Sequence, residues 1–222
     1  DCKLIFLIGG TPTEAHPIVG LEMKKALRKG CTFIVADPRQ IWFAQHAKLY
    51  LPIRPGTDNW LLNAMAHVIL KEGLENNEFI KTRTEGFEEL KAFVKDITPE
   101  KAAEFTDIRQ AARLYAKSEK SAIYYTLGIT EHTCGTDNVR TIANLALLTG
   151  HVGKPSTGVN PIRGQNNVQG ATDMCTPDKL PGYQLFSDQK AVEKFEKAWG
   201  ITLNKTPGNT SPTMFERMHK GE

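Results

Sequence analysis

The segment from Gly158 to Gly170 concentrates side chains that could hold an anion or the edge of a heteroaromatic ring. It contains one arginine, Arg163, among several asparagines and glutamines and three glycines, and it has no acidic residue. An arginine offers a planar charged fork to a phosphate or carboxylate, and each carboxamide offers both donors and an acceptor. Glycines let the backbone approach a ligand closely. Surface turns favour the same residue types, so composition alone leaves an ordinary turn open.

A second group of polar residues follows the first apolar run, where a strand pattern gives way to a helix pattern. The residues from Gly9 to Glu14 occupy this turn, and open α/β sheets bind nucleotides at such turns. The turn lacks the G-x-G-x-x-G pattern, so an NAD site of the usual type is not expected. Asp37 ends the next apolar run, where a carboxylate can accept ribose hydroxyls, and Arg39 can reach a phosphate or stack on a base. The alternative for this pair is a turn closed by Asp-Pro.

Two further acidic positions lie beside predicted helices and strands. Asp58 follows Gly56 and Thr57 and precedes a helical pattern. It is therefore either an N-cap residue or an acceptor for the two adjacent donors of a guanine. Glu131 and His132 follow a later strand pattern, a place where a lone histidine is more often structural than catalytic. The histidines show no metal-ligand spacing and the cysteines form no C-x-x-C pair, so no metal site is expected from this chain alone.

Alternating strand and helix patterns position these residues. Residues 4–8 form a continuous apolar run, which is typical of a strand buried on both faces. Residues 17–30 carry a helical pattern that starts at a proline and ends at a glycine. Residues 32–36 predict a second buried strand. Together the three segments predict a β-α-β unit of the nucleotide-binding kind.

The alternation continues to about residue 150, and beyond residue 154 the periodicity is lost until about residue 189. The carboxamide-rich segment lies within this irregular stretch, and loops of such length in compact domains are usually functional or disordered. The other expected elements are an extended stretch at 48–53, a helix from 58 to 73, helices within 75–118 with a start signal at Thr98-Pro99, a strand at 121–127, a helix at 136–150, a last helix at 191–199, and a turn or linker at 205–212.

The chain is therefore predicted to adopt an α/β fold. We expect a Rossmann-like nucleotide-binding domain, with a parallel sheet flanked by helices, over residues 1–165, incomplete at its N-terminus. Residues 166–222 are expected to supply a ligand loop and a segment of a neighbouring domain. Because the chain starts at Asp1 and not at a methionine, we expect it to be an internal part of a longer polypeptide.

Charge and hydropathy exclude several classes of partner. The net charge is +3 with no long run of either sign, so a general nucleic-acid or anionic-membrane surface is not indicated. No apolar run approaches the ~18 residues that a membrane span needs, so no membrane insertion is expected. We expect a cytoplasmic protein, or a periplasmic one if a preceding segment carries a signal.

With its flanking residues, the Gly158–Gly170 segment resembles the large, catalytic subunit of molybdenum- or tungsten-dependent formate dehydrogenases, in the molybdopterin oxidoreductase family. Separate blocks share this resemblance in the family's order. It covers nearly the whole chain and weakens only at about residues 96–110 and after Ile201. The blocks are Gly10 to Pro17, Asp37 to Arg39, Arg54 to Asp58, Gly128 to His132, Asn144 to Gly150, Asp173-Met174 and Leu180 to Gln184.

The resemblance implies a bis(molybdopterin guanine dinucleotide) cofactor that carries molybdenum or tungsten. It also implies that a [4Fe-4S] cluster and the metal-ligating cysteine or selenocysteine belong to a part of the subunit that precedes this chain. Arg163 matches the active-site arginine that holds the carboxylate of formate; alternatively it is a phosphate ligand with no part in chemistry. Glu131 stands where the family commonly has a pterin-contacting glutamine, which is a departure. The residues implied at the cofactor are Gly10, Thr11, Glu14, Asp37, Arg39, Gly56, Thr57, Asp58, Gly128, Glu131, Gly164, Gln165 and Asn166.

The expected function is that of a formate dehydrogenase catalytic subunit, which oxidises formate to CO2 and passes electrons through the iron-sulfur cluster to an iron-sulfur or diaphorase-type partner subunit. The other domains of the same subunit are expected partners too, and the 222 residues alone are expected to be inactive. Two alternatives remain open: a related reductase of nitrate or another oxyanion, and a non-catalytic nucleotide-binding or assembly module.

Overall fold

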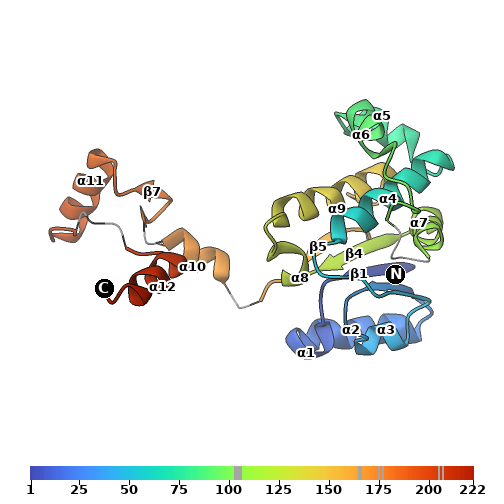
Figure 1. Ribbon diagram of the computed structural model, residues 1–222, viewed down its shortest axis with the longest axis horizontal. Coiled ribbons are helices and arrows are strands. Elements are labelled where there is room, and N and C mark those ends of the chain that lie inside the picture. Colours follow the sequence, from blue (N-terminus) through green and yellow to red (C-terminus); the bar gives the residue numbers. More distant parts are fainter. Residues whose placement is uncertain (103–106, 165–166, 175, 177, 205, 207) are drawn as a thin grey trace. The chain divides into compact units, whose positions relative to one another are not determined.

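The computed structural model describes residues 1–102, 107–164, 167–174, 176, 178–204, 206 and 208–222 (Figure 1). The chain divides into two compact units, residues 1–164 and residues 165–222. The larger unit contains the sheet and most of the residues expected at a ligand site, and the smaller unit has a core of its own.

A five-stranded sheet forms the centre of the larger unit. Its strands are β1 (Leu4–Ile8), β2 (Thr32–Ala36), β3 (Leu49–Leu51), β4 (Ser121–Tyr125) and β5 (Gly158–Pro161). They pair in the order β3-β2-β1-β4-β5, and every pairing is parallel. The order reverses between β1 and β4, as it does in doubly wound folds. The predicted α/β fold with a parallel sheet is confirmed.

Both faces of the sheet are covered, which explains why its inner strands are uninterrupted apolar runs. Phe6 and Ile8 of β1 pack into one apolar cluster, and Ile5 and Leu7 pack into the cluster on the opposite face. All four side chains are nearly inaccessible to water. Full burial of such a side chain stabilises the fold by about 1.5–3 kcal/mol, so β1 anchors both layers of the unit.

Helices form the two outer layers (Figure 1). One face carries α2 (Pro17–Arg28) and α3 (Trp42–Gln45), and the other carries α4 (Asp58–Lys71), α7 (Ile108–Lys117) and α9 (Gly135–Thr149). Apolar residues at helical spacing bury one side of α2, α4, α7 and α9, as the sequence predicts. The sequence did not predict α3. The shorter helices are α1 (Pro12–Ala15), α5 (Asn77–Arg83), α6 (Phe87–Val94) and α8 (Leu127–Thr130).

The smaller unit is built from helices and one short hairpin. Its helices are α10 (Val168–Met174), α11 (Gln189–Trp199) and α12 (Ser211–His219), and an antiparallel pair joins β6 (Lys179–Leu180) to β7 (Gln184–Leu185). Its core is small and consists of Leu180, Ala191 and Val192, with partly buried neighbours.

Three expectations about secondary structure differ from the structure in whole or in part. The stretch at 151–188 is not irregular throughout, because it contains β5, whose pairing with β4 overrides the poor strand propensity of a glycine and a proline. The expected turn or linker at 205–212 is right in type for the described residues up to Thr210 but ends there, because α12 begins at Ser211 with Thr210 as its cap, which accepts the Thr213 N–H. The start signal at Thr98-Pro99 forms a turn, and α7 begins only at Ile108.

Candidate functional site

The carboxyl ends of β1, β2 and β4 surround a cavity of about 380 Å³. It lies at the reversal of strand order, where open α/β sheets bind their ligands. Many of the residues expected at a ligand line it, and they come from separate parts of the sequence. They are Gly10, Thr11, Glu14, Asp37, Arg39, Asp58 and Gly128.

Asp58 is the most unusual group in this cavity, because its carboxylate is buried without a hydrogen-bond partner. The residue is 1% exposed, and neither oxygen accepts a hydrogen bond from the described residues. Thr57, not Asp58, is the N-cap of α4, and no side chain caps this helix end. The N-cap alternative for Asp58 is therefore wrong. A buried carboxylate without partners is costly, and a ligand that donates hydrogen bonds would relieve that cost.

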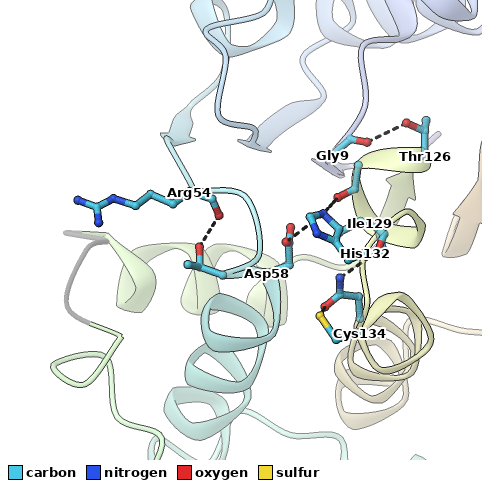
Figure 2. Close-up of polar contacts among 10 residues, drawn as sticks. Gly9, Arg54, Asp58, Thr126, Ile129, His132 and Cys134 are labelled. Carbon is cyan, nitrogen blue, oxygen red and sulfur yellow. Dashed lines mark hydrogen bonds and ion pairs between the residues drawn. The ribbon is translucent and has the colours of Figure 1, made fainter. Parts of the chain in front are cut away.

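Burial raises the pKa of the Asp58 carboxyl above its usual value. The backbone N–H groups of Asp58 and Gly56 and the nearby His132 partly offset the rise, although neither N–H reaches the carboxylate with hydrogen-bond geometry. The His132 Nε2 atom lies 4.0 Å from Asp58 Oδ2 and 2.9 Å from the Gly128 carbonyl oxygen (Figure 2). His132 therefore holds the end of α8 and faces the buried acid at the same time.

Asp37, Arg39 and Thr11 form a hydrogen-bonded group at the ends of β1 and β2. Asp37 Oδ1 accepts the Arg39 backbone N–H at 2.9 Å, and the Arg39 guanidinium donates to Thr11 Oγ1 at 2.6 Å. Burial raises the pKa of Asp37, and the N–H and guanidinium of Arg39 partly offset this rise. The Asp37 side chain is 6% exposed and that of Arg39 67%. A buried acceptor thus lies beside an exposed cation, an arrangement suited to a ribose next to a phosphate.

Two glycines allow the ends of β1 and β4 to meet closely enough to form the cavity wall. Gly9 has a φ of +57°, and a Cβ built on it would lie 2.8 Å from the Gly128 carbonyl carbon. A Cβ on Gly128 would lie 2.6 Å from the Gly9 oxygen. That oxygen accepts a hydrogen bond from Thr126 Oγ1 at 2.8 Å (Figure 2). It also accepts the Gly128 N–H at 3.2 Å. Only glycine fits at either position without a backbone shift.

We expect Gly9→Ala to lower the free energy of unfolding by about 3 kcal/mol or more, because it combines a left-handed φ with a clash against backbone. Urea denaturation of the purified protein measures the change. Gly30→Ala is the matched control: Gly30 has a φ of +90° but nothing within 4 Å of the added Cβ, so it should cost only about 1 kcal/mol. Equal losses in the two variants would contradict a role for the close approach.

Arg163 lies outside the cavity lining, although it is at the same edge of the sheet. The ladder continues past β5 through the Ile162 N–H, which donates to the Tyr125 carbonyl at 2.9 Å. Arg163 follows directly, and its carbonyl accepts a hydrogen bond from the His16 ring. Its side chain is exposed, and its charge opposes the rise that burial causes in the pKa of Tyr125. The guanidinium is therefore available to an anion beside the end of β4.

The remaining expected residues take several positions. Gly56 and Thr57 lie on the turn before α4, and Thr57 Oγ1 donates to the Arg54 carbonyl at 2.8 Å (Figure 2). Glu131 is exposed at the end of α8, outside the cavity lining. Gly164 follows Arg163, with open space around its Cα. Gln165 and Asn166 lie outside the described residues.

Sequence reasoning missed the roles of Thr126 and His132 in this site. Thr126 follows β4 and donates to the Gly9 carbonyl after β1, a contact that no pattern along one strand can reveal. His132 was expected to be structural, and its bond to the Gly128 carbonyl is structural. Its proximity to Asp58 depends on how α8 and α4 come together, which the local sequence does not indicate.

The sheet order and the cavity at its reversal point are those of open α/β domains in which nucleotides bind. The chain belongs to the molybdopterin oxidoreductase family, whose sequence profile matches residues 1–222. The resemblance drawn from the sequence is thereby confirmed.

Curated relatives match almost the entire chain. It is 44% identical to formate dehydrogenase H of Escherichia coli over 99% of its length, and 44% identical to the F420-dependent formate dehydrogenase subunit alpha of Methanocaldococcus jannaschii. The assimilatory nitrate reductase catalytic subunit of Bacillus subtilis is 36% identical over 99% of the chain. The chain spans about a third of the length of these relatives, 31%, 33% and 32% respectively.

A solved structure agrees with the fold. Acetylene hydratase from Pelobacter acetylenicus superposes with a TM-score of 0.66 at 30% identity, over 70% of this chain and 22% of that one. Among the described residues, no group of three or more His, Cys, Asp or Glu side chains is placed to hold a metal ion, and no helix is long and apolar enough to cross a membrane.

Proposed function

We propose that this chain is part of the catalytic subunit of a formate dehydrogenase, an oxidoreductase that converts formate to CO2. The 44% identity to formate dehydrogenase subunits over nearly the whole chain carries this proposal. The family supplies a molybdopterin cofactor with molybdenum or tungsten. We infer the bis(molybdopterin guanine dinucleotide) form, which accepts the electrons of formate when bound.

The donor and acceptor groups of the cavity fit one guanine dinucleotide arm of that cofactor. Asp58 has two unpaired, buried oxygens, and guanine presents two adjacent donors, N1–H and the exocyclic amine. Asp37 and Arg39 would hold the ribose and a phosphate at the ends of β1 and β2. Gly10, Thr11, Glu14 and Gly128 would form the walls.

Arg163 would hold the substrate. Formate has two oxygens that match the two parallel N–H donors of a guanidinium, and this bidentate contact would aim the C–H hydrogen toward the metal centre. Its position at the end of β5, next to β4, puts it along the edge where the cavity lies. Gln165 and Asn166 would contact the pterin, as Glu131 would from the end of α8. The alternative is that Arg163 binds only phosphate.

Other parts of the catalytic subunit would complete the enzyme. We infer that they carry the metal-ligating cysteine or selenocysteine and the [4Fe-4S] cluster, which would pass electrons to an iron-sulfur or diaphorase-type subunit. The 222 residues alone would then show no formate oxidation. We infer a cytoplasmic enzyme, or a periplasmic one if a preceding segment carries a signal.

The intact protein is expected to contain molybdenum or tungsten, pterin and guanine nucleotide, and to reduce a viologen dye with formate. Metal analysis, pterin fluorescence and nucleotide release measure the content. A parallel assay with reduced viologen and nitrate tests the related activity that the 36% identical nitrate reductase suggests. Nitrate reduction without formate oxidation would overturn the formate assignment. Absence of both activities from a metal-replete protein would favour a non-catalytic module.

A further inference from the structure

Two cysteines lie next to each other at the end of the sheet opposite the cavity. Cys2 precedes β1 and Cys31 precedes β2, two strands that pair in parallel with Leu4 opposite Thr32. The Thr32 N–H donates to the Lys3 carbonyl at 2.9 Å, so the ladder continues beyond β1 toward Cys2. Extending the register puts Cys31 one residue from the position directly opposite Cys2.

This offset suits a disulfide. Neighbouring strands lie ~4.8 Å apart, and both cysteines lie just outside the regular ladder, where the strict alternation of faces no longer applies. Disulfides span about 4.4–6.8 Å between Cα atoms, with about 5.5–6 Å most common. Both thiols also belong to the same face of the sheet, since Cys31 is a buried member of the cluster that contains Ile5, and Cys2 packs against that cluster.

The two thiols differ in their access to solvent. Cys31 is 6% exposed, whereas Cys2 is only partly buried. Cys134 is remote from them: it precedes α9, and its sulfur lies 3.7 Å from Asn138 Oδ1. Cys175 lies outside the described residues. Among the described cysteines, only Cys2 and Cys31 are neighbours.

We propose that Cys2 and Cys31 form a reversible intramolecular disulfide, with a low-molecular-weight disulfide such as oxidised glutathione as the oxidant. The Cys2 thiolate attacks one sulfur of the oxidant, forms a mixed disulfide and releases one thiolate. Cys31 then loses its proton and attacks the Cys2 sulfur, which releases the second thiolate. Two cysteine thiols are oxidised, one small disulfide is reduced to two thiols, and the two cysteine protons pass to them.

The electrostatics of the pair agree with this order of attack. Interaction with the Cys31 S–H lowers the pKa of Cys2 to about 7 and raises the pKa of Cys31. The Cys2 sulfur also lies 3.0 Å from the Leu4 carbonyl oxygen and 3.5 Å from that of Lys120. Cys2 is thus the more acidic and the less buried of the two thiols, so it is the one that attacks the oxidant.

The bond would tie β1 to β2 across a loop that contains α1 and α2. Cross-linking such a loop restricts the unfolded chain, and the corresponding rise in Tm is roughly 5–10 °C for a chain of this size. The opposite ends of the same strands carry Gly9 and Asp37 at the cavity, so the oxidised form would hold these two walls more firmly.

Incubating the purified native protein with oxidised glutathione tests the proposal. Peptide mass spectrometry after alkylation is expected to find one linked pair, a Cys2 peptide joined to a Cys31 peptide, reversed by dithiothreitol. Differential scanning calorimetry of the same samples should show the rise in Tm. Cys134→Ser is the matched control and should retain both results, whereas Cys2→Ser and Cys31→Ser should lose both.

Protein oxidised in urea provides a reference, because there the four cysteines of the chain should pair in a mixture. The proposal is supported if the native sample shows only the Cys2–Cys31 pair while the urea sample shows the mixture. Stable glutathione adducts on Cys2 with no internal link, or the same mixture with and without urea, would overturn it. Because Cys2→Ser changes a partly buried residue, circular dichroism should establish that the variant is folded before its result is used.

Discussion

Arg163→Ala in the intact protein is expected to lower kcat/KM for formate oxidation by roughly 10²- to 10³-fold while the metal and guanine nucleotide content stays unchanged. The size follows from removing one partner of a charge-assisted, bidentate contact, which costs about 2–5 kcal/mol. Cofactor retention is expected because Arg163 lies outside the cavity that Asp58 and Asp37 line. Viologen-linked kinetics, with nucleotide released by acid from the same samples, measure both quantities.

Two further variants make this result specific. Arg163→Lys keeps the charge but loses the fork, so it should recover only part of the activity. Arg140→Ala removes an exposed arginine that pairs with Asp137 at 3.4 Å on α9, and it should behave as wild type. Loss of cofactor from Arg163→Ala would identify a phosphate ligand, and wild-type activity in that variant would exclude a part in chemistry.

Asp58→Asn should have the second large effect: it should weaken nucleotide binding but stabilise the cofactor-free protein. The amide keeps one acceptor where a carboxylate offers two to the adjacent donors of guanine, so we expect bound nucleotide to fall by about 30-fold or more at limiting cofactor. In cofactor-free protein the same change removes a buried charge that has no hydrogen-bond partner. There the free energy of unfolding should rise by about 1–3 kcal/mol at pH 7.

The pH dependence of the cofactor-free protein gives an independent test. The pKa of Asp58 is raised in the folded state from 3.8, so the folded chain holds this proton more tightly than the unfolded chain does. Stability from this group is therefore present below the unfolded pKa and is lost as pH rises through the folded one. Asp58→Asn should flatten that part of the curve, and Asp137→Asn, an exposed acid on α9, should leave it unchanged. If Asp58→Asn stabilises the cofactor-free protein but binds as much nucleotide as wild type when cofactor is supplied, the guanine role is contradicted.

The elements that could be predicted are those in which an apolar run is bounded by a residue that ends a strand or helix. Strands β1 and β2 have the predicted bounds, because apolar runs there end at a glycine and at Asp37. The β5 strand could not be found this way, since its pairing partner and not its own residues makes it a strand. At the site, the residues on turns after strands were predicted to lie near a ligand. The absence of a hydrogen-bond partner for the Asp58 carboxylate was not predicted, because it depends on how α4 and α8 pack and on which donors they bring near it.

The Gly9 carbonyl accepts two hydrogen bonds, and this also affects the entropy that is lost when a ligand binds. Thr126 and Gly128 brace this turn through contacts made within the chain, so the wall has its shape before a ligand arrives. Association then loses little loop entropy, and more of the contact energy appears as affinity. The hydrogen bonds between the turns after β1 and β4 thus act as preorganisation, and a substitution that removed them would weaken binding although none of these groups need contact the ligand.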